Sequence, residues 1–279
     1  PWADTDSIGW LRYTLDRQGI PYTYLRDEEI RQGDLAERVD LIVYGNVDLD
    51  LQAQIHGLEP VGGPMAFAPT LDYPSLGEPV ASDDITGGIG WAGMAHLESF
   101  VEEGGVLLTL GRGSELALDG GLIRFVRRSS PEGISTPGAE LRTRFPQPDH
   151  PLAYGYGDST TVFRANLPVY DLPRRWVRMA YCTSCLDGPI DRGPVVMEWG
   201  GVPAGTPGAD GAARPPIVVS GGGKNEDRLA GHPAILAVAR GRGTIVAYNF
   251  NPMHRYLNHS DHRLLWNAVL NWQHLRPAN

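Results

Sequence analysis

Apolar residues recur at helical spacing near the start of the chain. In residues 5–19, Ile8, Leu11 and Leu15 fall on one face, and Gly19 can close the helix in a left-handed conformation. The same spacing predicts helices over residues 91–103 and 261–272. The apolar positions that we expect to face the core are Trp91, Met94, Leu97 and Val101 in the first and Leu265, Ala268, Val269 and Trp272 in the second.

Short, compact apolar runs alternate with these helices and predict buried strands. Helices that alternate with strands are typical of α/β proteins. We therefore predict an α/β fold, a flavodoxin-like or Rossmann-like doubly wound sheet with a β-rich insertion or subdomain. The segments expected as strands are 22–25, 40–44, 106–110, 122–126, 141–145, 161–164, 176–181, 195–199, 217–220, 234–239 and 244–250.

The pattern predicts a single domain over residues 1–279 with two irregular parts. Residues 46–84 are rich in Pro and Gly and predict a long loop, which in a compact domain is often functional or an insertion. Residues 139–200 hold short strand-like runs separated by Pro, Gly and Asp, and predict a β-rich insertion.

Composition and charge argue against some classes of function. Hydrophobic residues make up 42% and charged residues 20% of the 279 residues, which is enough apolar surface for a packed core. The net charge of −9 argues against a nucleic-acid partner, because such proteins usually carry a basic face. No run of about 18 apolar residues is present, so we expect no membrane span. The chain begins at Pro1 without Met or a signal peptide, so we expect a trimmed chain, a mature chain or a fragment.

The run 106–110 is followed directly by Gly111-Arg112-Gly113-Ser114, the place where α/β enzymes carry a nucleophile or bind phosphate. A nucleophile elbow needs Ser or Cys in the middle of the turn, where this chain has Gly113. The turn therefore favours close packing of strand and helix. Arg112 and Ser114 remain candidates for binding a ligand, and Ser114 is a weak candidate nucleophile.

Several histidines have the spacing of metal ligands. His56 and Glu59 form an H-x-x-E pattern, but it lies in the 46–84 loop without a third ligand. His254, His259 and His262 form the densest group of possible ligands and are weak candidates for a metal site. Solvated side chains in a loop before a helix are the competing interpretation.

His254 also belongs with its neighbour Arg255 among the candidate binding residues, since Arg255 can meet an anionic ligand or an internal carboxylate.

Cys182 and Cys185 are the two cysteines of the chain and form one C-x-x-C. A structural zinc site usually has four ligands, and no second C-x-x-C is present. The turn-like sequence that follows them does not suit a thioredoxin-like site. We expect a local disulfide or two inert thiols.

The order of motifs along the chain resembles a known family. An initial helix leads to the run 40–44, then to the Gly-rich helix start at 87–93, the strand 106–110 and the closing segments 241–246, 251–255 and 264–270. This order resembles the class I glutamine-amidotransferase-like domain that follows the catalytic domain in exported bacterial zinc carboxypeptidase-like proteins. The likeness covers most of the chain except residues 46–84 and parts of 130–215.

The resemblance implies a flavodoxin-like fold and a peptidase domain upstream of Pro1 in the same protein. It implies zinc only in that upstream domain, no cofactor in this chain, and a secreted or periplasmic location. True amidotransferases use a Cys nucleophile at the elbow, where this chain has Gly113, so no catalytic residue carries over.

Three functions follow as expectations. The first is a non-catalytic accessory domain that supports assembly, stability or substrate access in a larger hydrolase. The second is an extracellular module that binds glycan or peptide or assembles into a homo-oligomer. The third is a divergent hydrolase that uses Ser114 with one of the late histidines.

Overall fold

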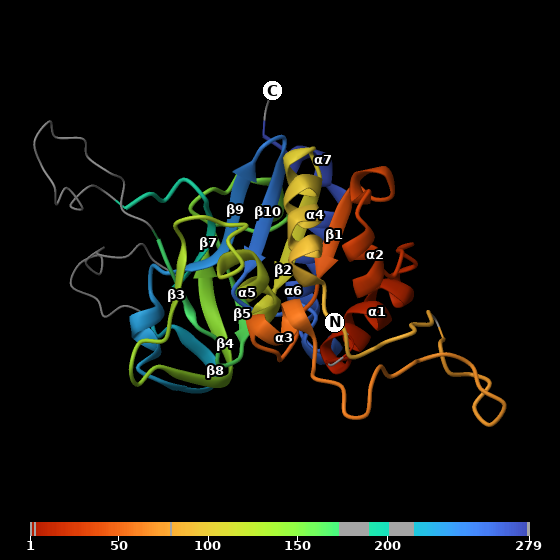
Figure 1. Cartoon of the computed structure of the whole chain (residues 1–279). Helices are drawn as coiled ribbons and strands as arrows, with labels where there is room; N and C mark the ends of the chain where they lie inside the picture. Colours follow the sequence, from red (N-terminus) through yellow and green to blue (C-terminus); the bar gives the residue numbers. More distant parts are fainter. Residues whose placement is uncertain (1, 3, 79, 173–189, 201–214, 278–279) are drawn as a thin grey trace, which may run out of the picture.

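The structure, a computed structural model, describes residues 2, 4–78, 80–172, 190–200 and 215–277. Within these residues an eight-stranded mixed sheet has the order β1-β2-β10-β9-β7-β4-β5, and β8 also pairs with β4 (Figure 1). A separate ladder joins β3 and β6. The strands are β1 (Leu41–Tyr44), β2 (Val106–Leu110), β3 (Arg127–Ser129), β4 (Ser135–Arg144), β5 (Ser159–Arg164), β6 (Val169–Asp171), β7 (Val195–Trp199), β8 (Val218–Lys224), β9 (Pro233–Arg240) and β10 (Gly243–Tyr248).

Three parallel strands form one side of the sheet. Leu41 of β1 and Thr244 of β10 both stand opposite Val106 of β2. Every residue of β2 and β10 is buried, as their nearly continuous apolar sequences predict for strands covered by helices on both faces.

Antiparallel strands extend this core on the other side. β10 turns back to β9 through Gly241, whose φ of +57° lies in the left-handed region. β7, β4 and β5 continue the same sheet, so strands from the range expected as a β-rich insertion, 139–200, lie in the main sheet.

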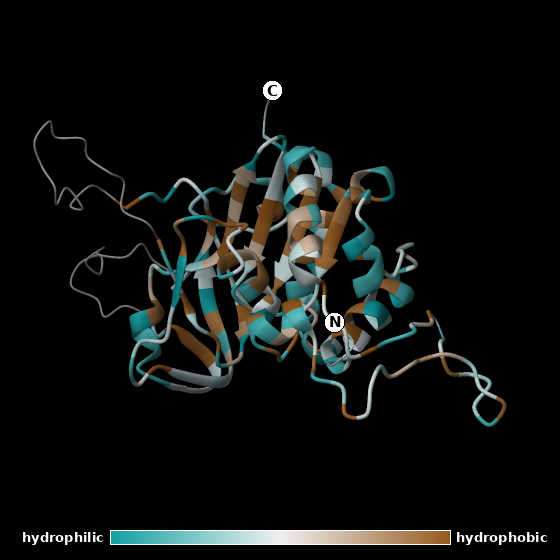
Figure 2. Cartoon of the chain, in the orientation of Figure 1, coloured by the Kyte–Doolittle hydropathy of each residue, from teal (hydrophilic) through white to brown (hydrophobic). Residues whose placement is uncertain are grey.

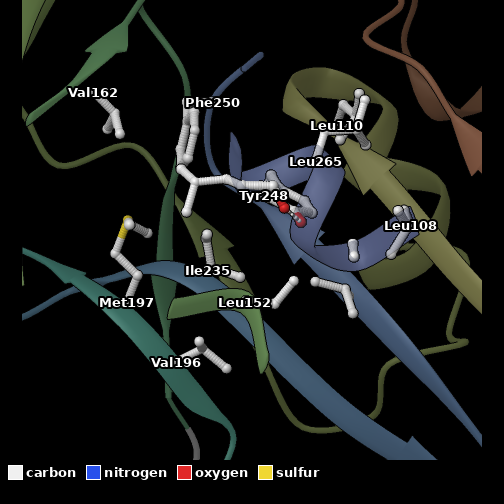
Figure 3. Close-up of a cluster of buried hydrophobic side chains, with 14 of the residues drawn as sticks. Leu108, Leu110, Leu152, Val162, Val196, Met197, Ile235, Tyr248, Phe250 and Leu265 are labelled. Carbon is white, nitrogen blue, oxygen red and sulfur yellow. Dashed lines mark hydrogen bonds between the residues drawn. The ribbon is translucent and has the colours of Figure 1, made fainter. Parts of the chain in front are cut away.

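Helices cover both faces of the sheet, and each layer forms its own core. Leu108 and Val246 pack with α1, α6 and α7, whereas their neighbours Leu107 and Ile245 pack with α2, α4 and α5 on the opposite face. Figure 2 shows the apolar strands between the two layers, and Figure 3 shows part of the first core. The predicted doubly wound α/β fold is thus confirmed. The helices are α1 (Asp6–Gln18), α2 (Asp27–Gln32), α3 (Leu51–His56), α4 (Gly90–Glu102), α5 (Ser114–Leu118), α6 (His259–Leu270) and α7 (Trp272–Leu275).

Four local predictions need correction. Residues 22–25 and 122–126 lie in no strand, although their sequences predict one in each case. Residues 176–181, also expected as a strand, lie outside the described residues. The 46–84 loop contains the helix α3, which Asp50 caps by accepting a hydrogen bond from the Ala53 N–H at 2.8 Å. Trp91 is 62% exposed and contacts the His56 ring, because it lies in the first turn of α4, outside the core.

None of the described helices is long and apolar enough to span a bilayer.

Candidate functional site

The loops that follow the three parallel strands meet at one edge of the sheet, where open α/β sheets bind ligands. The Gly111 N–H after β2 donates to the Phe250 carbonyl after β10 at 3.0 Å. The Arg112 N–H donates to Asn46 Oδ1 after β1, also at 3.0 Å. These bonds tie the three loops together at the candidate site.

Gly113 is the middle residue of the turn after β2, where a nucleophile elbow would carry its reactive side chain, and it has no room for one. A Cβ at this position would lie 2.1 Å from the Gly45 carbonyl oxygen and 3.0 Å from the Tyr44 ring. The turn after β2 therefore packs directly against the backbone that follows β1. The structure supports the interpretation of this motif as a packing turn.

Ser114 is buried, with 1% of its surface exposed. Its Oγ accepts a hydrogen bond from the Thr109 hydroxyl at 3.0 Å, and lies 3.1 Å and 3.2 Å from the carbonyl oxygens of Thr109 and Tyr248. No histidine is among the partners of this hydroxyl in the described residues. A serine nucleophile needs access to substrate and a neighbouring base. The position of Ser114 is that of a structural hydroxyl and argues against the hydrolase alternative.

Arg112, a candidate for binding an anion, is committed to carboxylates of the chain itself. It forms an ion pair with Asp48, and its Nε lies 3.3 Å from Glu115 Oε1. Sequence reasoning did not select these partners, although both acidic residues closely follow a predicted strand. The two carboxylates offset the positive charge of Arg112, so little attraction for an anionic ligand remains.

Glu115 is shared with a second guanidinium. Arg128 Nη1 lies 2.7 Å from Glu115 Oε1, and Arg128 also pairs with Asp119. Burial alone would lower the pKa of Arg128, but hydrogen bonding to Asp119 and the charge of Glu115 outweigh it and raise the pKa. The network holds the buried Glu115 side chain between two cations, which is a stable arrangement rather than a reactive one.

The structure does not bring the three late histidines together as metal ligands. The His254 ring stacks on Phe163 with a centroid distance of 4.4 Å, whereas His259 and His262 lie side by side at 5.0 Å. Among the described residues, His56 and Glu59 included, no group of three or more His, Cys, Asp or Glu side chains has a geometry that could hold a metal.

Burial and nearby positive charge lower the pKa of His254 and of His262. Burial, together with the neighbouring Arg255, lowers the pKa of His254. Burial and the charge of His259 lower the pKa of His262 to about 4.

Asp261 lies beside the histidines and is 1% exposed. It accepts a hydrogen bond from the Phe163 N–H at 3.0 Å, and burial raises its pKa to about 7.

Arg255 is exposed and has no hydrogen bond or ion pair within the described part of the chain. Its φ of +51° and that of Tyr256, +57°, place two consecutive non-glycine residues in the left-handed region. Such strain costs about 1–3 kcal/mol per residue and is often found at functional sites. Arg255 is therefore the one sequence-predicted binding residue that the described structure leaves available. Cys182 and Cys185 lie outside the described residues.

Comparisons with known proteins found similar solved structures but no similar sequence. No protein-family model matches the chain, and no curated protein sequence matches it. Two solved structures, cytoplasmic proteins from Salmonella typhimurium and its strain LT2, are 11% and 12% identical, each with a TM-score of 0.47. The alignments cover 96% and 95% of this chain and 86% of each neighbour. A putative ThuA-like protein from Bacteroides uniformis is 14% identical over 64% of this chain and 62% of its own, with a TM-score of 0.34.

These neighbours correct one expectation. A secreted or periplasmic location was predicted from the resemblance, and it is contradicted because both Salmonella proteins are described as cytoplasmic.

Proposed function

We propose that this chain is a non-catalytic domain of a larger protein and supports the assembly, stability or substrate access of its partner domain. The observation that carries the proposal is the closed turn at Gly113, where a Cβ would lie 2.1 Å from the Gly45 carbonyl oxygen. The nucleophile position of the fold is thus filled by backbone. The resemblance to zinc carboxypeptidase-like proteins supplies the partner in this proposal, an upstream peptidase domain that would hold the zinc.

The intact mass of the protein from its natural source tests the proposal. A mass well above 30.4 kDa, with H-x-x-E-bearing peptides upstream of Pro1, supports it. A mass near 30.4 kDa counts against it. A second test uses a fluorophosphonate probe and a glutaminase assay on this chain and on Ser114→Ala. We expect neither labelling nor ammonia release, and turnover that disappears in Ser114→Ala overturns the proposal.

A second candidate function, self-assembly or partner binding, is favoured by the segment between α3 and α4. We call residues 58–78 and 80–84 the arm, which extends away from the sheet in Figure 1. The backbone pair of Phe67 and Ser82, at 2.8 and 3.0 Å, joins its two sides partway along. Beyond that pair, Leu71 and Tyr73 are exposed, and Val61 is exposed on the near side. Exposed apolar side chains that gather on one segment mark interaction surfaces.

Light scattering tests this candidate. If the arm mediates assembly, the wild-type chain forms defined oligomers and Leu71→Asp shifts them to monomer. Leu270→Asp is the matched control, because Leu270 is also exposed but lies at the end of α6. A monomeric wild-type chain, or an equal effect of both variants, contradicts a role of the arm in self-assembly.

A further inference from the structure

A cavity of about 550 Å³ lies beside β1, at the end of the sheet. β1 forms one of its walls and residues 20–25 form another. Leu11 and Trp272 line it from one helical layer, and Ile30 and Leu97 line it from the other. The cavity therefore lies between the two layers, at the level of the sheet itself.

The backbone on both sides of the cavity lacks strand partners. In the described structure β1 pairs with β2 alone, so alternate residues of β1 direct their N–H and C=O groups toward the open side. Across the cavity, residues 21–25 belong to no strand and make no backbone–backbone hydrogen bond with any described residue. Tyr44, which also lines the cavity, has a buried hydroxyl without a hydrogen-bond partner in the described residues.

Two backbone edges without strand partners face this space. Protein interiors are close-packed, so a space of about 550 Å³ between two helical layers is unusual. Leu, Ile and Val side chains make up much of its lining, beside polar side chains such as Asp27 and Thr23, and the two backbone edges offer regularly spaced hydrogen bonds. The cavity has the composition expected of a place for another strand.

The start of α1 shows from which direction such a strand would come. Asn46 Nδ2, just after β1, donates to Ser7 Oγ at 3.1 Å, and the Asp48 N–H donates to the Asp4 carboxylate. α1 thus begins at the carboxyl end of β1. In a doubly wound sheet a parallel strand ends at this edge and leads through a short loop into its helix.

We propose that the cavity receives one β-strand, supplied by the polypeptide directly N-terminal to Pro1, parallel to β1 and hydrogen-bonded both to β1 and to residues 22–25. The 13 residues of α1 then form the crossover from this strand to residues 22–25. The order becomes residues 22–25, the added strand and β1, which is the 2-1-3 order of flavodoxin-like sheets. Because helices cover both faces, the strand is a nearly continuous apolar run of about five residues.

Hydrogen exchange read by mass spectrometry tests the proposal on two chains. One begins at Pro1, and the other includes the residues that precede Pro1 in its gene. In the longer chain we expect exchange at residues 22–25 and at the outward-facing amides of β1 to slow at least tenfold. Exchange in β10 should stay unchanged, which confirms that both chains are folded.

A variant pair separates strand insertion from general stabilisation. Leu15→Glu places a charge on the cavity wall and should abolish the added protection in the longer chain, whereas Leu270→Glu at the exposed end of α6 should preserve it.

Four results overturn the proposal. These are equal exchange in both chains, protection already present in the shorter chain, protection that grows with the concentration of the shorter chain, and a gene with no apolar run before Pro1. The third result assigns the cavity to a second copy of the chain instead.

Discussion

Replacing Gly113 by Ala tests whether the nucleophile position is closed by backbone. The φ of −57° and ψ of −21° at Gly113 are helical, so Ala adopts this conformation without strain. Restricting the unfolded chain would by itself stabilise the protein by about 0.4–1 kcal/mol. Any loss of stability must therefore come from the new Cβ.

The steric cost follows from the contacts of that Cβ. It would lie 2.1 Å from the Gly45 carbonyl oxygen, so the backbone must move by about 1 Å or more to restore van der Waals distance. The same backbone leads into Asn46, whose side chain accepts from the Arg112 N–H, so this movement disturbs a hydrogen bond as well. Overpacking of this kind costs about 1–3 kcal/mol, and we expect a net loss of about 1–2 kcal/mol.

Equilibrium urea unfolding of Gly113→Ala and Gly9→Ala measures the effect. Gly9 lies exposed in α1, and a Cβ there meets no atom within 4 Å. The same substitution should therefore stabilise by about 0.5–1 kcal/mol at Gly9, because Ala favours helix. If Gly113→Ala is as stable as the wild type, the turn has room for a side chain. The reasoning against a nucleophile at this position is then refuted.

Three further predictions concern buried charged or titratable groups. Glu198→Ala should cost about 1.5–3 kcal/mol in urea unfolding, since the buried Glu198 carboxylate accepts from Arg144 and Arg192, whose guanidinium groups stay partly exposed to solvent. Asp261→Asn should stabilise the protein above pH 7 and have little effect below pH 4 in unfolding curves at several pH values. The raised pKa of about 7 makes the wild type lose stability as pH rises from 3.8 to 7. The His262 ring should titrate near pH 4 by NMR. Because the unfolded chain binds this proton near pH 6.5 and the folded chain does not, the stability of the protein should fall as pH falls from 6.5 to 4. A titration midpoint near 6.5 contradicts the burial of the ring.

The parallel half of the fold could be predicted because its signals are local. Strands buried on both faces need nearly continuous apolar runs, and residues 106–110 and 244–250 show them directly. The place of residues 139–200 was harder to predict. Their short strands resemble an insertion along the sequence, and only pairing between distant segments, such as β4 with β5 and β7, shows that they extend the main sheet.

The turn after β2 could be located from the sequence, but the interactions of its side chains could not. The glycines after 106–110 mark the turn in sequence, whereas the partners of Arg112 depend on where the loop after β1 passes. Asp48 lies 64 positions away in the chain, so no local spacing indicates the pair. The same limit applies to His254, whose spacing suggested metal ligation but whose ring packs on Phe163 from a distant strand.

Residues 22–25 show how a prediction and a structure can differ for a physical reason. Their apolar and aromatic composition favours a strand, yet a strand is stable only when a neighbour completes its hydrogen bonds. The described structure places them across a cavity from β1, where neither edge has a partner. If the cavity receives a strand, residues 22–25 form the predicted strand in the longer protein. They lack it in this chain because the neighbouring strand that would bind them is absent. A tenfold slowing of exchange at these residues would therefore support both the strand prediction and the proposed source of its partner.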